Sequence, residues 1–112
     1  MARKTVLVTG ASRGIGKATA LRCLEDGLEV IGLSTTARDD LPWPHYGVDL
    51  GNSSSKAQLQ DIITKHRPCR FVGNAGILIS GHLEDVGSAD FDRLMRINLF
   101  SLIETANLFL PV

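Results

Sequence analysis

A glycine-rich turn near the start of the chain places the strongest constraint on its fold. The turn reads Thr9-Gly10-Ala11-Ser12-Arg13-Gly14-Ile15-Gly16 and follows the run Thr5-Val6-Leu7-Val8, which is typical of a buried parallel strand. Helical periodicity follows, so the glycines join a strand to a helix. The first N–H groups of such a helix are unpaired and carry the positive end of its dipole. The expected ligand is an anion such as a nucleotide phosphate.

The three glycines are expected to do different things. Gly10 allows the tight turn, Gly14 leaves room for a pyrophosphate, and Gly16 lets the helix lie close to the strand. The phosphate loop of nucleoside triphosphatases is the main alternative. That loop requires glycine at position 11 and serine or threonine at position 18, where this chain has Ala11 and Ala18. A dinucleotide is therefore favoured over a triphosphate and over a purely structural turn.

Composition narrows the class of protein. A chain of 112 residues is predicted to form a single domain, residues 1–112. Its 12 basic and 12 acidic residues cancel, which gives no electrostatic reason to expect nucleic acid or a membrane surface as a partner. Cys23 and Cys69 are too few for a disulfide framework, and neither has metal-ligand spacing. We expect a cytoplasmic protein without a metal site, a signal peptide or a membrane span.

The rest of the chain alternates between strand and helix patterns. The predicted order is a helix to Gly27, a strand over 29–34, a weak strand over 45–50, a helix ending before Pro68 and a strand over 69–73. The loop before the weak strand contains Trp43, which is expected to pack at the surface. His66 is expected to be a cation that suits the dipole of the last helical turn. This order predicts an α/β fold with a Rossmann-like doubly wound parallel sheet, truncated after about four strands.

A long final helix is predicted from Ser88 to Pro111. Its second half is apolar on nearly every side, so more than the sheet must cover it. We therefore expect association through this C-terminal apolar helix, either as a homo-oligomer or with another partner.

The motifs together resemble those of the short-chain dehydrogenase/reductases. The glycine turn, Asp49, Asn74-Ala75-Gly76 and Asn98 occur in the order and at the intervals of that family, and the resemblance covers essentially the whole chain. It implies that the turn holds a cofactor pyrophosphate, that Asp49 faces the adenine and that the Asn-Ala-Gly triplet supports the sheet beside the adenosine ribose. The implied cofactor-binding residues are Gly10, Ser12, Arg13, Gly14, Ile15, Gly16, Asp49, Asn74, Ala75 and Gly76.

Residues at the end of the second strand bear on the choice of cofactor. An acidic residue there would bind a ribose 2′-hydroxyl and repel a 2′-phosphate. This chain has Ser34, Thr35 and Arg38, with no acid before Asp39. Arg13 adds a second positive charge. NADP is therefore expected in preference to NAD, the alternative being that Arg38 is an ordinary exposed loop residue.

The resemblance also shows what the sequence does not contain. Members of the family use a serine and a Tyr-x-x-x-Lys pair for hydride transfer to or from a carbonyl, with a helical asparagine that holds a relay water. Only the asparagine, Asn98, is found among the 112 residues, because Tyr46 is followed at the required spacing by Leu50. Gly73 also stands where the family has a second asparagine, which weakens a backbone-supporting contact.

The resemblance therefore implies the NADP(H)-binding portion of an oxidoreductase that is inactive by itself. A non-catalytic nucleotide-binding or protein-interaction module remains an alternative, and so does an unstable product that aggregates.

Overall fold

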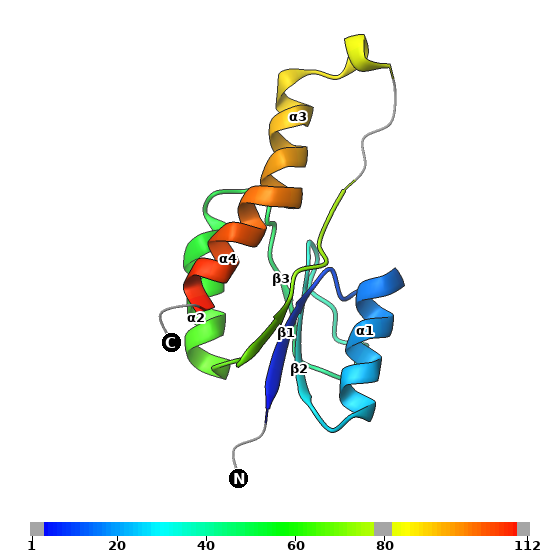
Figure 1. The fold of residues 1–112 in the computed structure, drawn as a ribbon, viewed down its shortest axis with the longest axis vertical. Coiled ribbons are helices and arrows are strands. Elements are labelled where there is room, and N and C mark those ends of the chain that lie inside the picture. Colours follow the sequence, from blue (N-terminus) through cyan, green and yellow to red (C-terminus); the bar gives the residue numbers. More distant parts are fainter. Residues whose placement is uncertain (1–3, 78–81, 110–112) are drawn as a thin grey trace.

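A parallel four-stranded sheet forms the centre of the protein, with the strands in the order β3-β2-β1-β4 (Figure 1). The computed structural model describes residues 4–77 and 82–109. The strands are β1 (Thr5–Thr9), β2 (Glu29–Ser34), β3 (His45–Gly47) and β4 (Arg70–Val72). β1 is buried along its whole length, since β2 and β4 pair with its two edges and its side chains belong to core clusters on both faces of the sheet. The predicted α/β class and the Rossmann-like parallel sheet are confirmed.

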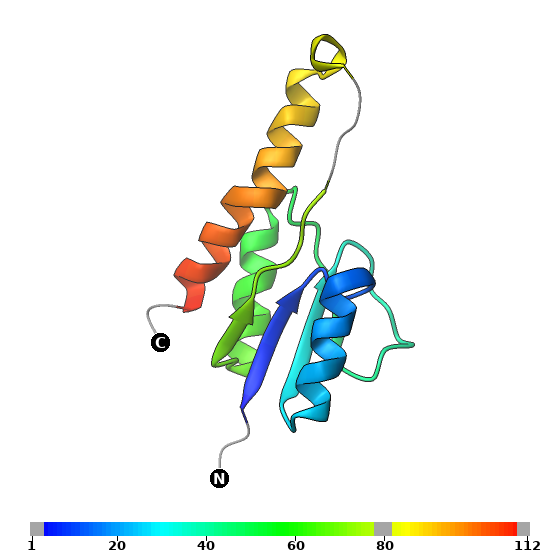
Figure 2. The same cartoon turned by 45° about the vertical axis from the view of Figure 1, so that its right-hand side comes forward.

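Helices cover both faces of this sheet, as Figure 2 shows. α1 (Gly14–Glu25) lies on one face, and α2 (Ser55–His66) and α4 (Ser101–Phe109) lie on the other. α3 (Ser88–Met95) continues into α4 through a π-helical segment, Arg96–Phe100. A short 3-10 helix, Leu83–Asp85, precedes α3. The predicted long helix is thus present from Ser88 to Phe109, and its predicted end at Pro111 lies outside the described residues.

The third strand is shorter than predicted. It ends at Gly47 instead of Leu50, since the Asn52 N–H donates to the Asp49 carbonyl at 3.0 Å and the chain has already entered a turn. Val48 and Leu50 are nevertheless buried, in the cluster beneath α2 and α4 that also contains Leu7 and Leu33. Their apolar pattern reflects this burial and not a longer strand.

The prediction for Trp43 was wrong. Its side chain is only 6% exposed and packs in the core cluster on the α1 face of the sheet, beside Val30. Space for the indole exists because β2 has a glycine at this point. A Cβ atom on Gly32 would lie 2.4 Å from Trp43 Nε1.

The expectation for His66 also needs correction. Its Nε2 lies 2.6 Å from the hydroxyl of Tyr46, and burial is the main cause that lowers the pKa of His66 below 6.5. The neutral ring is therefore favoured, and the side chain acts as a hydrogen-bonding partner for β3. Lys65 supplies the positive charge in the last turn of α2.

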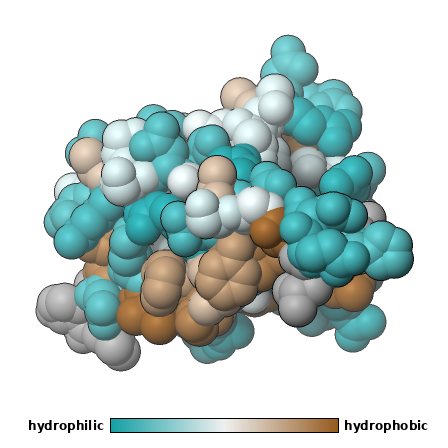
Figure 3. All heavy atoms as spheres, turned by 90° about the horizontal axis from the view of Figure 1, so that it is seen from above, coloured by the Kyte–Doolittle hydropathy of each residue, from teal (hydrophilic) through white to brown (hydrophobic). Residues whose placement is uncertain are grey.

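The second half of the chain leaves apolar side chains exposed. α3 projects beyond the sheet (Figure 1) and has no buried residue. The large apolar side chains exposed on α3, the π-helical segment and α4 are Phe91, Leu99, Phe100, Leu102 and Ile103. Figure 3 shows hydrophobic atoms gathered along one side of the molecule when it is viewed from above. Within the described residues, no helix is long and apolar enough to span a membrane.

Candidate functional site

The glycine turn connects β1 to α1 with a backbone that other residues adopt only under strain. Gly10 and Gly14 have φ values of +68° and +59°. A Cβ atom on Gly16 would lie 2.0 Å from the Gly10 carbonyl oxygen, so the first turn of α1 packs directly on the end of β1. A Cβ atom on Gly14 would meet nothing within 4 Å. The turn is therefore tightly packed at Gly16, whereas the space beside Gly14 is open.

The open side of the turn suits an anion. The first turn of α1 contains no acidic residue, and the residue that precedes the helix, Arg13, makes no side-chain capping hydrogen bond. Backbone N–H groups and the helix dipole at this end remain available to a negative group outside the protein. The Ala11 N–H donates to the Leu33 carbonyl at 3.1 Å and fixes the turn to the end of β2.

A buried threonine ties the turn to the end of β4. Thr9 Oγ1 accepts hydrogen bonds from the backbone N–H groups of Asn74 and Ala75, both at 3.0 Å. The Asn74 side chain donates to the Gly10 carbonyl at 3.3 Å. Thr9 was not among the predicted site residues, because nothing in the sequence distinguishes it from any other threonine in a strand.

A small cavity of about 70 Å³ is lined by residues at or just after the ends of all four strands. Predicted residues from separate parts of the chain meet in its wall, namely Gly10, Ser34, Thr35, Asp49, Ala75 and Gly76. The remaining wall is apolar and was not predicted as part of the site; it consists of Leu33, Val48, Leu50, Ile77 and Ile97. The wall of the cavity thus combines apolar side chains with polar groups, a combination that suits a heteroaromatic ring.

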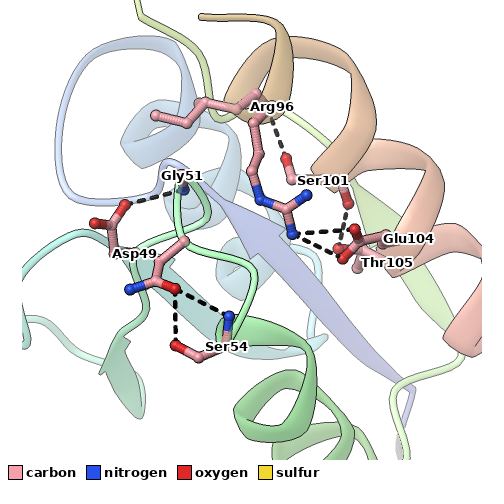
Figure 4. Close-up of polar contacts among 9 residues, drawn as sticks. Asp49, Gly51, Ser54, Arg96, Ser101, Glu104 and Thr105 are labelled. Carbon is pink, nitrogen blue, oxygen red and sulfur yellow. Dashed lines mark hydrogen bonds and ion pairs between the residues drawn. The ribbon is translucent and has the colours of Figure 1, made fainter. Parts of the chain in front are cut away.

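Asp49 is already paired at the rim of this cavity. Its Oδ1 accepts the Gly51 N–H at 2.9 Å (Figure 4) and lies 3.3 Å from Nη2 of Arg93 on α3. Arg93 was not predicted as a site residue, since 44 positions separate it from Asp49. The pairing connects the projecting helix to the candidate site.

A second, wider pocket of about 280 Å³ lies beside the glycine turn and is lined by Ser12, Arg13, Ser34, Thr35, Thr36 and Arg38. Arg38 Nη1 donates to the Ser12 carbonyl at 3.0 Å, so this side chain bridges from the loop after β2 to the turn. Its Nε also donates to Asp40 at 2.8 Å. The hydrogen bond from Arg38 is the main cause that holds the pKa of Asp40 below its usual value. Arg38 is therefore structurally engaged and is not a free loop residue.

Asn98 lies in the π-helical segment, and both ends of its amide are occupied by backbone. Oδ1 accepts the Ile77 N–H at 2.8 Å, and Nδ2 donates to the Ile77 carbonyl at 3.0 Å. The side chain therefore holds the segment after β4 against the helix. π-helical turns occur frequently at functional sites, where they re-aim side chains.

Polar contacts hold the helix together after this turn (Figure 4). Ser101 Oγ donates to the Ile97 carbonyl and Thr105 Oγ1 donates to the Ser101 carbonyl, both at 2.7 Å. Arg96 Nη2 donates to Glu104 at 3.1 Å. These contacts join the π-helical segment to α4.

The space beside Gly73 is filled by apolar atoms. A Cβ atom there would lie 2.1 Å from Leu102 Cδ1 and 3.1 Å from Phe71 Cζ. The absence of a side chain at position 73 thus brings α4 close to the sheet. No group of three or more His, Cys, Asp or Glu side chains within residues 4–77 and 82–109 is placed to hold a metal ion.

Comparison with known proteins identifies relatives for this arrangement. The sequence model of a family described as short chain dehydrogenase matches residues 4–43, which include the glycine turn. A 3-oxoacyl-(acyl-carrier-protein) reductase of Buchnera aphidicola is 34% identical over 110 residues. This match covers 89% of the chain but 45% of that reductase. The chain therefore spans somewhat less than half the length of this relative.

Solved structures show the same architecture. The ligand-free aldohexose dehydrogenase of Thermoplasma acidophilum is 32% identical and superposes with a TM-score of 0.86, over 97% of this chain and 44% of that one. A metagenomic short-chain oxidoreductase in complex with NADP is 25% identical, with a TM-score of 0.85 over 96% of this chain and 55% of that one.

Proposed function

We propose, on the premise that the chain belongs to the short-chain dehydrogenase family, that its glycine turn and the adjoining pockets bind a dinucleotide cofactor, with NADP(H) preferred over NAD(H). The observation that carries the proposal is the shape of the turn. Gly16 closes it from behind, while the position where a side chain of Gly14 would project is open space. A pyrophosphate group seated there would receive backbone N–H groups from the start of α1.

The remaining parts of the cofactor have matching surroundings. The cavity beside Asp49 would receive the adenine, although its size requires the ring to sit partly outside or its walls to move apart. The pocket between Ser12 and Arg38 would receive the adenosine ribose and a 2′-phosphate. Arg13 and Arg38 support the preference for NADP, because guanidinium groups suit a phosphate dianion and Arg38 is held at the rim of the pocket.

In a complete oxidoreductase of this family the cofactor would supply hydride to a carbonyl or take it from a secondary alcohol. The residues of this chain would bind and orient it, and Asn98 would position the segment after β4 beside it. General acid catalysis contributes about 100- to 10,000-fold to such reactions. Because the 112 residues contain no Tyr-x-x-x-Lys pair, we propose that the chain does not turn over substrate by itself.

A protein-interaction module is the second candidate. The exposed apolar residues of α3 and α4 favour it. The two candidates differ in their response to cofactor, since only the first requires binding at the glycine turn.

A melting experiment with the purified chain tests the proposal. Cofactor at about 100 times its dissociation constant would add about 2.7 kcal/mol of stability, which raises the Tm of a domain of this size by roughly 10 °C. We expect such a rise with NADP and a smaller one with NAD at equal concentration. No rise with either nucleotide at millimolar concentration would contradict the proposal.

Gly14→Ala locates the site, and Gly27→Ala is its matched control. Both glycines have positive φ, +59° and +86°, and neither has an atom within 4 Å of an added Cβ. Each substitution should therefore lower the free energy of unfolding by a similar amount, about 1 kcal/mol. Only Gly14→Ala places a methyl group in front of the turn, so only this variant should lose affinity for NADP. Equal affinities would place the phosphate elsewhere.

A further inference from the structure

Three side chains form a hydrogen-bonded row from the core to the edge of the wider pocket. Trp43 Nε1 lies 3.2 Å from His45 Nδ1, and His45 Nε2 lies 2.6 Å from Ser34 Oγ. Ser34 Oγ in turn lies 2.7 Å from the Thr36 carbonyl oxygen. Ser34 and Thr36 line the pocket of about 280 Å³, whereas His45 stands behind them. The row therefore ends at the wall that the glycine turn faces.

The chemistry of the groups assigns every proton in this row. An indole N–H only donates, so His45 Nδ1 must accept and carries no hydrogen. The hydrogen of the neutral ring is then on Nε2 and is donated to Ser34 Oγ. A carbonyl oxygen only accepts, so Ser34 donates its own hydrogen to Thr36. In this state Ser34 offers the pocket an acceptor and no donor.

The tryptophan end of the row is held in place by packing. Trp43 is 6% exposed, and a Cβ atom on Gly32 would lie 2.6 Å from His45 Nδ1. The pair therefore occupies the space above a glycine of β2. Protonation of His45 would add a hydrogen to Nδ1 that points at the indole N–H. Two donors at 3.2 Å repel each other, so the indole must shift when the ring gains a proton.

The charged groups near His45 have opposite effects on its pKa. Burial is the largest cause that lowers the pKa of His45 below 6.5, Arg38 lowers it further, and Asp40 raises it. Lys17 on α1 helps to lower the pKa of Asp40, and Gly32 and Ser34 of β2 lie beside the His45 ring. The neutral form is favoured in the absence of a ligand. An anion in the pocket would offset the effect of Arg38 on the pKa of His45 and would therefore favour the protonated ring.

We propose that His45 is a positioning and specificity-determining residue for the ribose 2′ group: it holds Ser34 when neutral and gains a proton when the pocket receives a 2′-phosphate. The inference rests on the proposed function, which assigns this pocket to the adenosine ribose. A 2′-hydroxyl can donate to Ser34 and leaves the row unchanged. A phosphate only accepts, so Ser34 must turn its hydrogen from Thr36 to the phosphate. The bond from Nε2 to Ser34 is then strengthened by a positive charge on His45.

The fluorescence of Trp43 reports this proton, because Trp43 is the single tryptophan of the chain and a protonated imidazole quenches indole emission. Emission is titrated from pH 8 to pH 5 without ligand, with AMP and with adenosine 2′,5′-bisphosphate, while circular dichroism monitors folding. We expect the free protein to titrate below pH 6.5 and AMP to leave the midpoint unchanged. Saturating bisphosphate should raise the midpoint by about half to one pH unit.

Two variants decide whether His45 is responsible. His45→Gln should abolish the titration of Trp43 emission. His66→Gln is the matched control, because burial also lowers the pKa of His66 and its ring lines a cavity together with Trp43, yet it bonds to Tyr46. Its titration should match that of the unmodified protein. Ser34→Ala should keep the titration but reduce the shift caused by bisphosphate.

The outcomes separate the two proposals. If neither nucleotide binds, the proposed function fails, while the titration of Trp43 by His45 can still be observed without ligand. If both nucleotides bind and produce the same midpoint, the proposed function stands and the inference for His45 is overturned. A titration that disappears in His66→Gln and persists in His45→Gln also overturns it. If a variant fails to fold, the midpoints of the unmodified protein with AMP and with the bisphosphate still decide the inference.

Discussion

At the scale of single residues, Asp40 competes for the guanidinium that a 2′-phosphate would need. Arg38 donates to Asp40 at 2.8 Å, and this bond is also the main cause that raises the pKa of Arg38. Both side chains are exposed enough for solvent to weaken the pair. A phosphate dianion could displace Asp40, but repulsion from the nearby carboxylate would remain.

Asp40→Asn should therefore increase the affinity for NADP relative to NAD by about two- to fivefold. Asp39→Asn is the matched control, because it removes the same charge one position away, and among the described residues the Arg38 side chain bonds to Asp40 and Ser12 but not to Asp39. The measurement is the ratio of the two dissociation constants at low salt. If the preference for NADP increases equally in both variants, the effect comes from net charge alone. If it does not increase in Asp40→Asn, Asp40 does not restrain Arg38.

Sequence could predict those site residues whose role is set by local sterics. Gly10, Gly14 and Gly16 are required wherever a strand must turn at once into a closely packed helix, and the structure has them in that turn. The pairing of Asp49 with Arg93 could not be predicted, because it depends on how a helix 44 residues away is placed. Trp43 was expected at the surface because it lies in a loop, whereas the absence of a side chain on Gly32 leaves space for its burial.

At the scale of elements, the strand and helix order could be predicted because each apolar pattern is continuous along the chain. The π-helical segment could not be predicted. Its sequence, Arg96–Phe100, has no proline or glycine, and the extra residue in the turn lies where Asn98 bonds to Ile77 on a separate segment. The limits of β3 were missed for a similar reason, since Val48 and Leu50 are buried without belonging to the strand.

The end of α2 stores strain that a substitution can release. Arg67 caps this helix with φ 47° and ψ 54°, and its N–H donates to the Ile63 carbonyl at 2.8 Å. A left-handed conformation costs about 1 kcal/mol in a residue with a Cβ atom. Arg67→Gly should therefore unfold at a Tm several degrees above that of Arg67→Ala, in thermal denaturation followed by circular dichroism.

The matched control uses the exposed Arg70 in β4. Both residues lose the same side chain and charge, but Arg70 belongs to a strand. There Ala should be more stable than Gly, because glycine loses more conformational freedom on folding. The same order at both positions would mean that the left-handed backbone is not the cause.

At the scale of the whole molecule, the apolar residues along α3 and α4 are the feature that the fold leaves without a partner. The helical stretch from Ser88 to Phe109 is roughly 30 Å long. It exposes Phe100 and Ile103, each to 49%, while α2 packs against its last part, α4. Large contiguous apolar surfaces on one molecule commonly mark an interface. We propose that a second copy of the chain covers this surface.

Sedimentation velocity over a range of protein concentrations tests this last prediction. The unmodified chain should form a faster-sedimenting species as concentration rises, and Phe100→Lys combined with Ile103→Lys should remain monomeric, because burying two added ammonium groups at an interface is unfavourable. Leu21→Lys is the matched control, since Leu21 is 40% exposed but lies on α1, on the opposite face of the sheet. It should associate as the unmodified chain does. A chain that stays monomeric at every concentration would contradict association through this helix, and loss of association in Leu21→Lys alone would move the interface to the α1 face.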